Sequence, residues 1–228
     1  MIDLQVWKGG GNFDAFHSLD TEKQTRIINA ALAEFAAKGF KRASTNAIAE
    51  NAQIGKGMLF YYFGNKDDLF SFLCQYTIEF ARNEYIRRFE TDSGDFLARH
   101  KAMTDVKKCA MREFPEIIGF FESFYREENA PYFEKFADDI AEIKQIAYGK
   151  IHDGVDYSLF REDIDGANVV KYLKWLLDAY EIETAERFRN GAFDLNDEQS
   201  AAAEWQRFYS FTEDLRKAFY REGKIQWR

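Results

Sequence analysis

The amino-acid sequence predicts an all-α protein. Only two prolines and five valines occur among 228 residues, and the apolar residues recur mostly at intervals of three and four. Hydrophobic residues make up 46% of the chain and aromatic residues 17%, which is enough material for a sizeable core. We therefore expect a globular protein built from packed helices.

The first predicted helix begins at Thr21. Thr21 and Gln24 have the spacing of a capping box, and Ile28 and Phe35 lie on the apolar stripe that the helix is expected to bury. Gly39 follows this stripe. It is expected to end the helix, because glycine readily adopts the left-handed conformation of a C-terminal cap.

Two short helices and a long one are expected next. Ser44 or Thr45 caps a helix that ends near residue 52, and after a turn a third helix covers residues 56–62. A long helix begins at Asn65 and continues to Phe89. Prolines near helix starts and clusters of glycine and aspartate separate the later elements. Five further helices are predicted, at residues 95–112, 115–128, 131–151, 165–189 and 198–222.

These elements suggest three parts of the chain. The stretch KGGGN at residues 8–12 resembles a linker, so residues 1–20 are expected to form an N-terminal arm. Residues 21–66, which we call the head, hold the short helices. Residues 67–228, which we call the body, hold the longer ones.

Charge is distributed unevenly between head and body. Residues 38–66 carry five basic side chains and one acidic side chain, a local charge of +4 in a chain whose net charge is −8. A basic head on an acidic body fits a protein that binds a polyanion through one small surface.

Several other classes of protein find no support in the sequence. Two cysteines without a short spacing indicate neither a disulfide framework nor a zinc ribbon, and no apolar run reaches the roughly 18 residues of a membrane span. The three histidines form no metal-binding motif, and HDGVD at residues 152–156 reads as a turn more readily than as a metal site. We expect a cytoplasmic protein that is not an enzyme and has no cofactor or metal.

The stretch GKGMLFYYFGNK at residues 55–66 is both basic and aromatic. On a helix, Leu59, Phe60 and Phe63 lie on a side that can pack inward. Met58, Tyr61 and Tyr62 are expected on another side, which needs a cover because exposed aromatic surface is unfavourable. A DNA major groove would provide one, with lysines at either end neutralising phosphates. Another part of the protein would provide one equally well, and periodicity does not decide between the two.

The run TEKQTRIINAALAEFAAKGFKRASTNAIAENAQIGKGMLFYYFGNKDDLF, from Thr21 to Phe70, resembles the DNA-binding domain of the TetR family of transcriptional regulators. The matching features are the AALAEFAAKGF helix, the stretch STNAIAENA, and KGMLFYYFGNKDDLF with its spacing of glycine, aromatic residues and lysine. The resemblance covers about 50 residues. It implies a homodimeric regulator, usually a repressor, that binds a double-stranded DNA operator through its head and a small-molecule effector through its body.

The resemblance also implies roles for individual residues. Thr45 would contact phosphate or a base, and Lys66 would contact phosphate. Tyr61 and Tyr62 would contact phosphates and base edges. At the floor of the major groove the resemblance places Lys56, Gly57 and Met58. Two positions depart from the family pattern: Gln53 stands where glycine is usual, and Gly55 where a serine or threonine normally caps the helix.

The body offers candidates for a dimer interface. The predicted helix at 165–189 has two apolar stripes on different sides, and the last helix has a similar surplus of apolar residues. A second subunit would cover the surplus, although a bulky monomeric core would also do so. The candidate interface residues are Tyr172, Trp175, Ala179, Ile182, Trp205, Phe208, Phe211 and Leu215.

The middle helices offer candidates for an effector pocket. The segment EIIGFFESFYREEN is rich in aromatic residues, which suit a small apolar or amphiphilic ligand. Glu122 hints at a cationic ligand, but a solvated helix face explains it more simply. The candidate lining residues are Met103, Phe120, Phe121, Phe124, Tyr125 and Trp175. The alternative function is a helical ligand-binding or protein-interaction module without gene-regulatory DNA binding.

Overall fold

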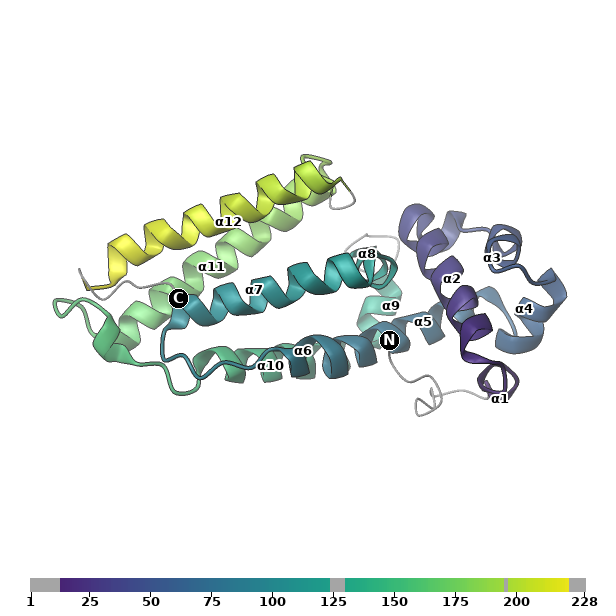
Figure 1. The fold of residues 1–228 in the computed structure, drawn as a ribbon, viewed down its shortest axis with the longest axis horizontal. Helices are drawn as coiled ribbons and strands as arrows, with labels where there is room; N and C mark the ends of the chain where they lie inside the picture. The colour runs from purple at the N-terminus through teal and green to yellow at the C-terminus, as the bar shows by residue number, and fades with distance from the viewer. Residues whose placement is uncertain (1–12, 124–129, 195–196, 222–228) are drawn as a thin grey trace. The chain divides into compact units, whose positions relative to one another are not determined.

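The structure, a computed structural model, describes residues 13–123, 130–194 and 197–221. These residues form helices and no strand, which confirms the all-α expectation (Figure 1). The α-helices are α1 (Asp14–His17), α2 (Thr21–Arg42), α3 (Thr45–Asn51), α4 (Lys56–Phe63), α5 (Lys66–Phe80), α6 (Ile86–Arg88), α7 (Phe96–Glu113), α8 (Pro115–Ser123), α9 (Ala130–Lys135), α10 (Ala137–His152), α11 (Gly166–Arg189) and α12 (Glu198–Phe219).

Most predicted helices agree with the observed ones to within a few residues. The predicted helix from Asn65 to Phe89 consists of α5, a π-helical turn at Ala81–Tyr85 and α6. The predicted helix at 131–151 is two helices, α9 and α10. Residues 124–128 of the predicted helix at 115–128 lie outside the described residues.

The chain forms two compact units. Unit 1 comprises residues 1–90 and 106–148, and unit 2 comprises residues 91–105 and 149–228. The packing of unit 1 therefore continues beyond residue 66, where the sequence suggested a boundary between head and body.

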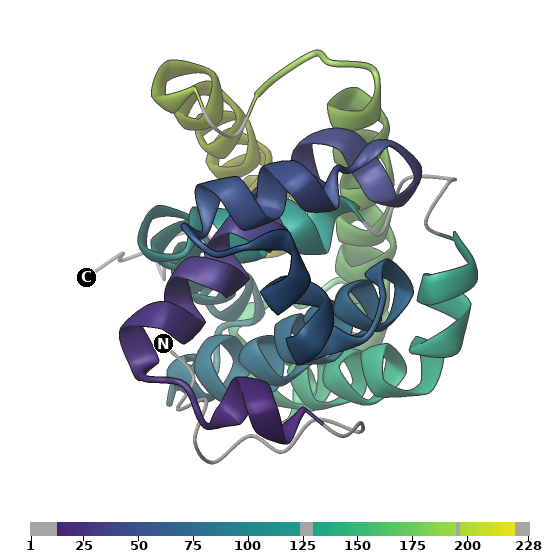
Figure 2. The same ribbon diagram turned by 90° about the vertical axis from the view of Figure 1, so that its right-hand side faces the viewer.

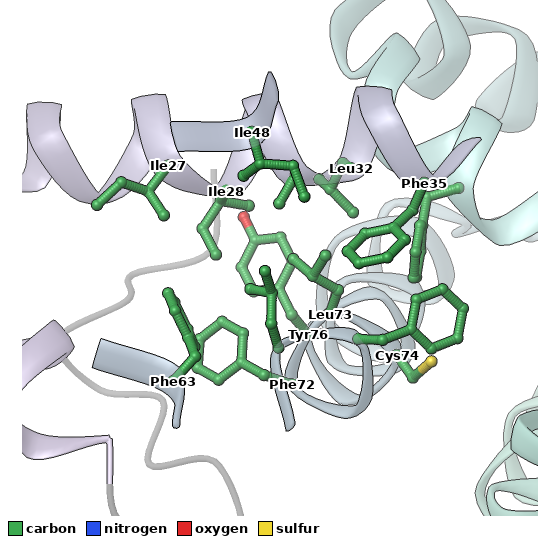
Figure 3. Packing of buried hydrophobic residues seen from close by; sticks show 14 of the residues in the cluster. Ile27, Ile28, Leu32, Phe35, Ile48, Phe63, Phe72, Leu73, Cys74 and Tyr76 are labelled. Carbon is green, nitrogen blue, oxygen red and sulfur yellow. The ribbon is translucent and has the colours of Figure 1, made fainter. Parts of the chain in front are cut away.

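The core of unit 1 lies between α2 and α5. Ile28, Leu32 and Phe35 follow one another along α2 at spacings of three and four and point toward Phe72 and Leu73 of α5 (Figure 3). These side chains are almost completely buried. Burying a large apolar side chain contributes roughly 1.5–3 kcal/mol, so this contact is a major source of the stability of unit 1.

Helix α1 is joined to this core. Phe16 is fully buried, and its ring lies 4.9 Å from Phe63 of α4 and 5.3 Å from Phe72 of α5. The amide of the buried Gln24 donates hydrogen bonds to the carbonyl oxygens of Phe16 and His17, at 3.1 Å each. Residues 13–17 thus pack with the helices that follow.

These contacts correct the expected start of α2. Thr21 and Gln24 do not form a capping box, because the Gln24 side chain is occupied by α1. Asp20 is the N-terminal cap, and its carboxylate accepts the backbone N–H of Lys23 at 2.8 Å. Gly39 has a φ of +70° and lies at a kink in α2, where the sequence placed the end of the helix.

The turn between α3 and α4 has the hydrogen bonds of a Schellman motif. The Ile54 N–H donates to the Ala49 carbonyl at 2.9 Å, and the Gln53 N–H donates to the Glu50 carbonyl at 3.0 Å. This motif requires a left-handed residue, and Gln53 fills the position with a φ of +56°. Among the described residues it is the one non-glycine with positive φ.

Unit 2 is organised by buried polar contacts and by α11 and α12, which run side by side (Figure 1). Arg216 of α12 donates to the Asp95 carboxylate at 2.6 Å, and the Tyr220 hydroxyl donates to the same carboxylate at 2.7 Å. Burial would raise the pKa of Asp95, but the bonds from Arg216, the Ala98 N–H and Tyr220 lower it. Helices α11 and α12 contact each other through the stacked rings of Tyr180 and Phe211, whose centres are 4.7 Å apart.

The two cysteines have different environments. Cys74 of α5 is buried, and burial raises the pKa of its thiol well above the ordinary value. Cys109 of α7 is exposed. Both are free thiols.

Two features are absent from the described residues. None of their helices is both long and apolar enough to cross a bilayer. Nor do their histidine, cysteine, aspartate and glutamate side chains form a group of three suited to a metal ion.

The strained turn leads to a first prediction. A non-glycine residue in the left-handed region costs roughly 1–2 kcal/mol, and glycine recovers this cost minus its larger loss of chain entropy. Gln53→Gly should therefore raise the free energy of unfolding by up to about 1 kcal/mol, measured by urea denaturation. Gln53→Ala keeps the positive φ and should bring no gain. An equal gain from alanine would trace the effect to the glutamine side chain instead.

Candidate nucleic-acid interface

Helix α4 presents an inward and an outward side. Leu59 and Phe63 are buried in the core of unit 1, as the sequence predicts. Met58 and Tyr61, three residues apart on the other side, are 40% and 68% exposed. A large aromatic ring and part of a thioether thus face outward from a helix short enough to fit a major groove.

Tyr62 does not lie on this outward side. It is only 4% exposed, so its expected exposure is wrong for the free chain. Tyr62 is four residues from Met58 but three from Leu59, and on a helix both spacings bring side chains together. Its ring packs inward with Leu59 and Phe63 and lies 5.9 Å from the Lys23 ammonium of α2.

Two glycines at the start of α4 are not required by the fold. Gly55 is the N-terminal cap residue and provides no side-chain hydrogen bond. Gly57 is exposed within the helix. A Cβ atom at either position would meet nothing within 4 Å. Glycine costs about 1 kcal/mol relative to alanine inside a helix, and packing within the described residues gives no reason for Gly57.

Helix α3 is held at its N-terminus by Glu34 of α2. The Ser44 hydroxyl caps α3 by accepting the Ala47 N–H at 3.3 Å, and the Ser44 N–H donates to the Glu34 carboxylate at 2.8 Å. Lys38 donates to the same oxygen of Glu34 at 2.9 Å. The neighbouring candidate Thr45 is half-buried in the first turn of α3.

Lys66 is the first residue of α5 and is half-buried. Its ammonium donates to the Lys41 carbonyl oxygen at 3.3 Å and lies 5.0 Å from the centre of the Phe40 ring. Burial lowers the pKa of Lys66, and the charge of Glu34 opposes this effect. The ammonium has thus lost part of its hydration already, which reduces the cost of replacing the remaining water by a phosphate oxygen.

The sequence analysis missed three exposed polar side chains around Lys66 and the start of α3. Lys41 and Arg42 end α2, and Asn46 lies in the first turn of α3. The two cations contributed to the local positive charge, which was the signal that could have identified them. Figure 2 views unit 1 from the side on which α1–α4 lie.

The candidate dimer residues of α11 are exposed in the single chain. Tyr172, Trp175, Ala179 and Ile182 all lie on its uncovered side, with Trp175 55% and Ile182 62% exposed. On α12, the candidate Leu215 is buried. The other three candidates on this helix are half-buried, namely Trp205, Phe208 and Phe211.

The effector candidates have varied surroundings. Phe120 is fully buried in the unit 1 core, 5.2 Å from the Phe70 ring, and Phe121 is partly buried beside it. In unit 2, Met103 is buried, whereas Trp175 faces outward. The other two candidates, Phe124 and Tyr125, lie outside the described residues.

Comparison with known proteins agrees with this geometry. Residues 27–72, from α2 into α5, match the family model described as bacterial regulatory proteins, tetR family. No curated protein matches the chain.

Solved structures share the fold along nearly the whole chain. A TetR family transcriptional regulator from Chloroflexus aurantiacus J-10-FL is 23% identical, with a TM-score of 0.56 over 92% of this chain and 98% of that one. The ketosteroid transcriptional regulator KstR2 of Mycobacterium tuberculosis is 16% identical, with a TM-score of 0.59 over 90% and 98%. A TetR-family transcriptional regulator from Haemophilus influenzae RD is 18% identical, with a TM-score of 0.50 over 88% and 98%. At these identities the likeness shows the fold alone.

A helix-turn-helix whose second helix begins with an exposed lysine and exposes Met58 and Tyr61, within an all-α chain of this fold, is typical of the class of DNA-binding transcriptional regulators. The match at residues 27–72 shows that this segment is similar to the DNA-binding part of the bacterial regulatory proteins of the tetR family.

The Glu34 contacts lead to a second prediction. Burial would raise the pKa of Glu34, but the hydrogen bonds from Lys38 and Ser44 lower it below its ordinary value of 4.5. A lowered folded pKa means that the unfolded chain binds the proton more readily, so Glu34 stabilises the fold above about pH 5 and loses this effect as the pH falls. Glu34→Gln should lower the free energy of unfolding by about 1 kcal/mol at pH 7, with a smaller difference at pH 4.

Urea denaturation at the two pH values measures this difference, and hydrogen exchange of the Ser44 amide reports the contact directly. Glu22→Gln is the control, because Glu22 forms an exposed ion pair with Arg26 on the same helix. Glu34→Ala removes the acceptor altogether and should speed exchange of the Ser44 amide, so unchanged exchange in that variant at pH 7 would contradict the assigned role.

Proposed function

We propose that the protein is a homodimeric transcriptional repressor that binds a pseudo-palindromic DNA operator and is released by a small apolar or amphiphilic effector. The outward side of α4 carries this proposal: Met58 and Tyr61 are exposed, with Lys56 exposed at the helix start. Major-groove recognition uses such side chains, because tyrosine donates to phosphates, methionine contacts base edges and lysine neutralises phosphate charge.

Gly57 supports the same reading. Among the described residues, no atom beyond its own helix backbone and chain neighbours lies within 4 Å of where a Cβ atom of residue 57 would be. A missing side chain lets the helix backbone approach a groove more closely, which gives the glycine a function that the fold does not. Four further residues are proposed to contact DNA phosphates, namely Lys66, Thr45, Lys41 and Arg42.

A two-fold operator requires a two-fold protein, and α11 offers the surface for it. Its inward side packs within unit 2, whereas Trp175 and Ile182 on its other side are more than half exposed. Exposed apolar side chains in a row are typical of a subunit interface. We propose that this side of α11, together with the half-buried aromatic residues of α12, meets its symmetry mate.

The effector is proposed to bind among the middle helices of unit 1, where Phe121 is partly buried. An effector releases DNA only if it binds the non-DNA-binding conformation more tightly. Trp175 is better assigned to the dimer interface than to an interior lining, because it faces outward.

Selection from a pool of random duplexes at near-physiological salt tests the function. Recovery of an inverted repeat by the purified protein is the expected outcome. Recovery of no sequence, before and after removal of bound ligand, would support the alternative of a helical module without regulatory DNA binding.

Variants of α4 provide the third prediction. Tyr61→Ala should weaken binding of the selected duplex by about tenfold. Lys56→Ala should lower the slope of log affinity against log salt by about 0.9 for each phosphate contact that is lost. Fluorescence anisotropy across a salt series measures both effects.

Two exposed residues of α10 serve as matched controls: Tyr148→Ala and Lys144→Ala should bind as the wild type does. If Tyr61→Ala and Lys56→Ala also bind as the wild type does, α4 is not the recognition helix.

The fourth prediction concerns the dimer. Ile182→Glu would place an unpaired carboxylate in an apolar interface and should raise the dimer dissociation constant at least about 100-fold. Analytical ultracentrifugation measures this constant. Ile146→Glu is the control, because Ile146 is an exposed isoleucine on α10. Equal behaviour of the two variants would place the interface elsewhere.

A further inference from the structure

Helix α9 contacts residues that surround Lys66 in the structure. The Tyr132 hydroxyl of α9 donates a hydrogen bond to the carboxylate of Asp67, the residue that follows Lys66. Its ring lies 5.0 Å from the Phe40 ring and 4.5 Å from the Phe70 ring. Helix α9 thus contacts the first turns of α5 through both the hydroxyl and the ring of Tyr132.

The same tyrosine supports the surface on which Lys66 rests. The Lys66 ammonium lies 5.0 Å from the centre of the Phe40 ring, a cation–π distance. Tyr132 packs against that ring and bonds to the neighbour of Lys66 in the chain. The Lys66 side chain is therefore fixed through two contacts of a residue that lies 66 positions further along the sequence.

Fixing a lysine has a measurable effect on phosphate binding. A free lysine side chain loses much rotamer freedom when it binds, and a side chain that is already held loses less. Burial and the bond to Asp67 raise the pKa of Tyr132, so its hydroxyl keeps its proton and remains a donor at neutral pH.

We propose that Tyr132 is a positioning residue for DNA binding, which holds Lys66 in place for a DNA phosphate through Phe40 and Asp67. The inference rests on the proposed function, because it takes Lys66 as a phosphate ligand. It also makes DNA affinity depend on the position of α9, a helix outside the family match at residues 27–72.

The test uses Tyr132→Phe, which removes the hydrogen bond to Asp67 and keeps the ring. A phosphate contact does not depend on sequence, so a mixed-sequence 30-base-pair duplex at low salt is a sufficient probe. Tyr132→Phe should weaken binding about three- to tenfold and lower the salt slope. Combined with Lys66→Ala, it should cause no further loss, because it acts through Lys66.

Tyr209→Phe is the matched control, since the Tyr209 hydroxyl donates to Asp105 at 2.5 Å in unit 2. It should leave DNA binding unchanged. Equal binding by Tyr132→Phe and the wild type would overturn the inference, as would an equal loss from Tyr132→Phe with and without Lys66. A wild-type protein that binds no duplex would overturn the proposed function as well, whereas binding by the wild type leaves that function standing.

Discussion

The burial of aromatic side chains among α1, α4 and α5 is the interaction on which the position of the DNA-binding helix α4 depends. Helix α4 has eight residues, far fewer than a helix needs to be stable alone in water. It holds its shape because Phe63 packs against Phe72 of α5 at 5.1 Å and against Phe16 of α1 at 4.9 Å. The outward side of α4 is free to contact a partner because its inward side is fixed by rings from two other helices, α1 and α5.

Local signals in the sequence were enough to place most helices. Prolines, glycines and short polar side chains determine where a helix begins and ends, and these signals act over a few residues. The turn at Gln53 shows this well: the departure from glycine was visible in the sequence, and the structure shows the positive φ that the departure implies. The family resemblance, carried by about 50 residues, was visible for the same reason.

The rotation of a helix about its own axis, and contacts between residues far apart in the sequence, were not predictable in the same way. Helix α4 is apolar nearly all round, so periodicity could not decide whether Tyr62 lies with Met58 or with Leu59. The amide of Gln24 was given to a local cap, whereas the structure uses it to hold α1. The contact of Tyr132 with Asp67 spans 65 positions, and no local pattern indicates it. Such contacts are decided by how helices pack, which a single sequence does not display.

The contrast between the two cysteines allows a spectroscopic probe to be attached selectively to the native protein. Only Cys109 offers an exposed thiol, while Cys74 is buried with its pKa raised. A maleimide dye or nitroxide added to the native chain would therefore attach at one place on α7 without any engineering. In the proposed dimer, each subunit would carry one such label, and the distance between the two labels would report changes in the dimer's conformation.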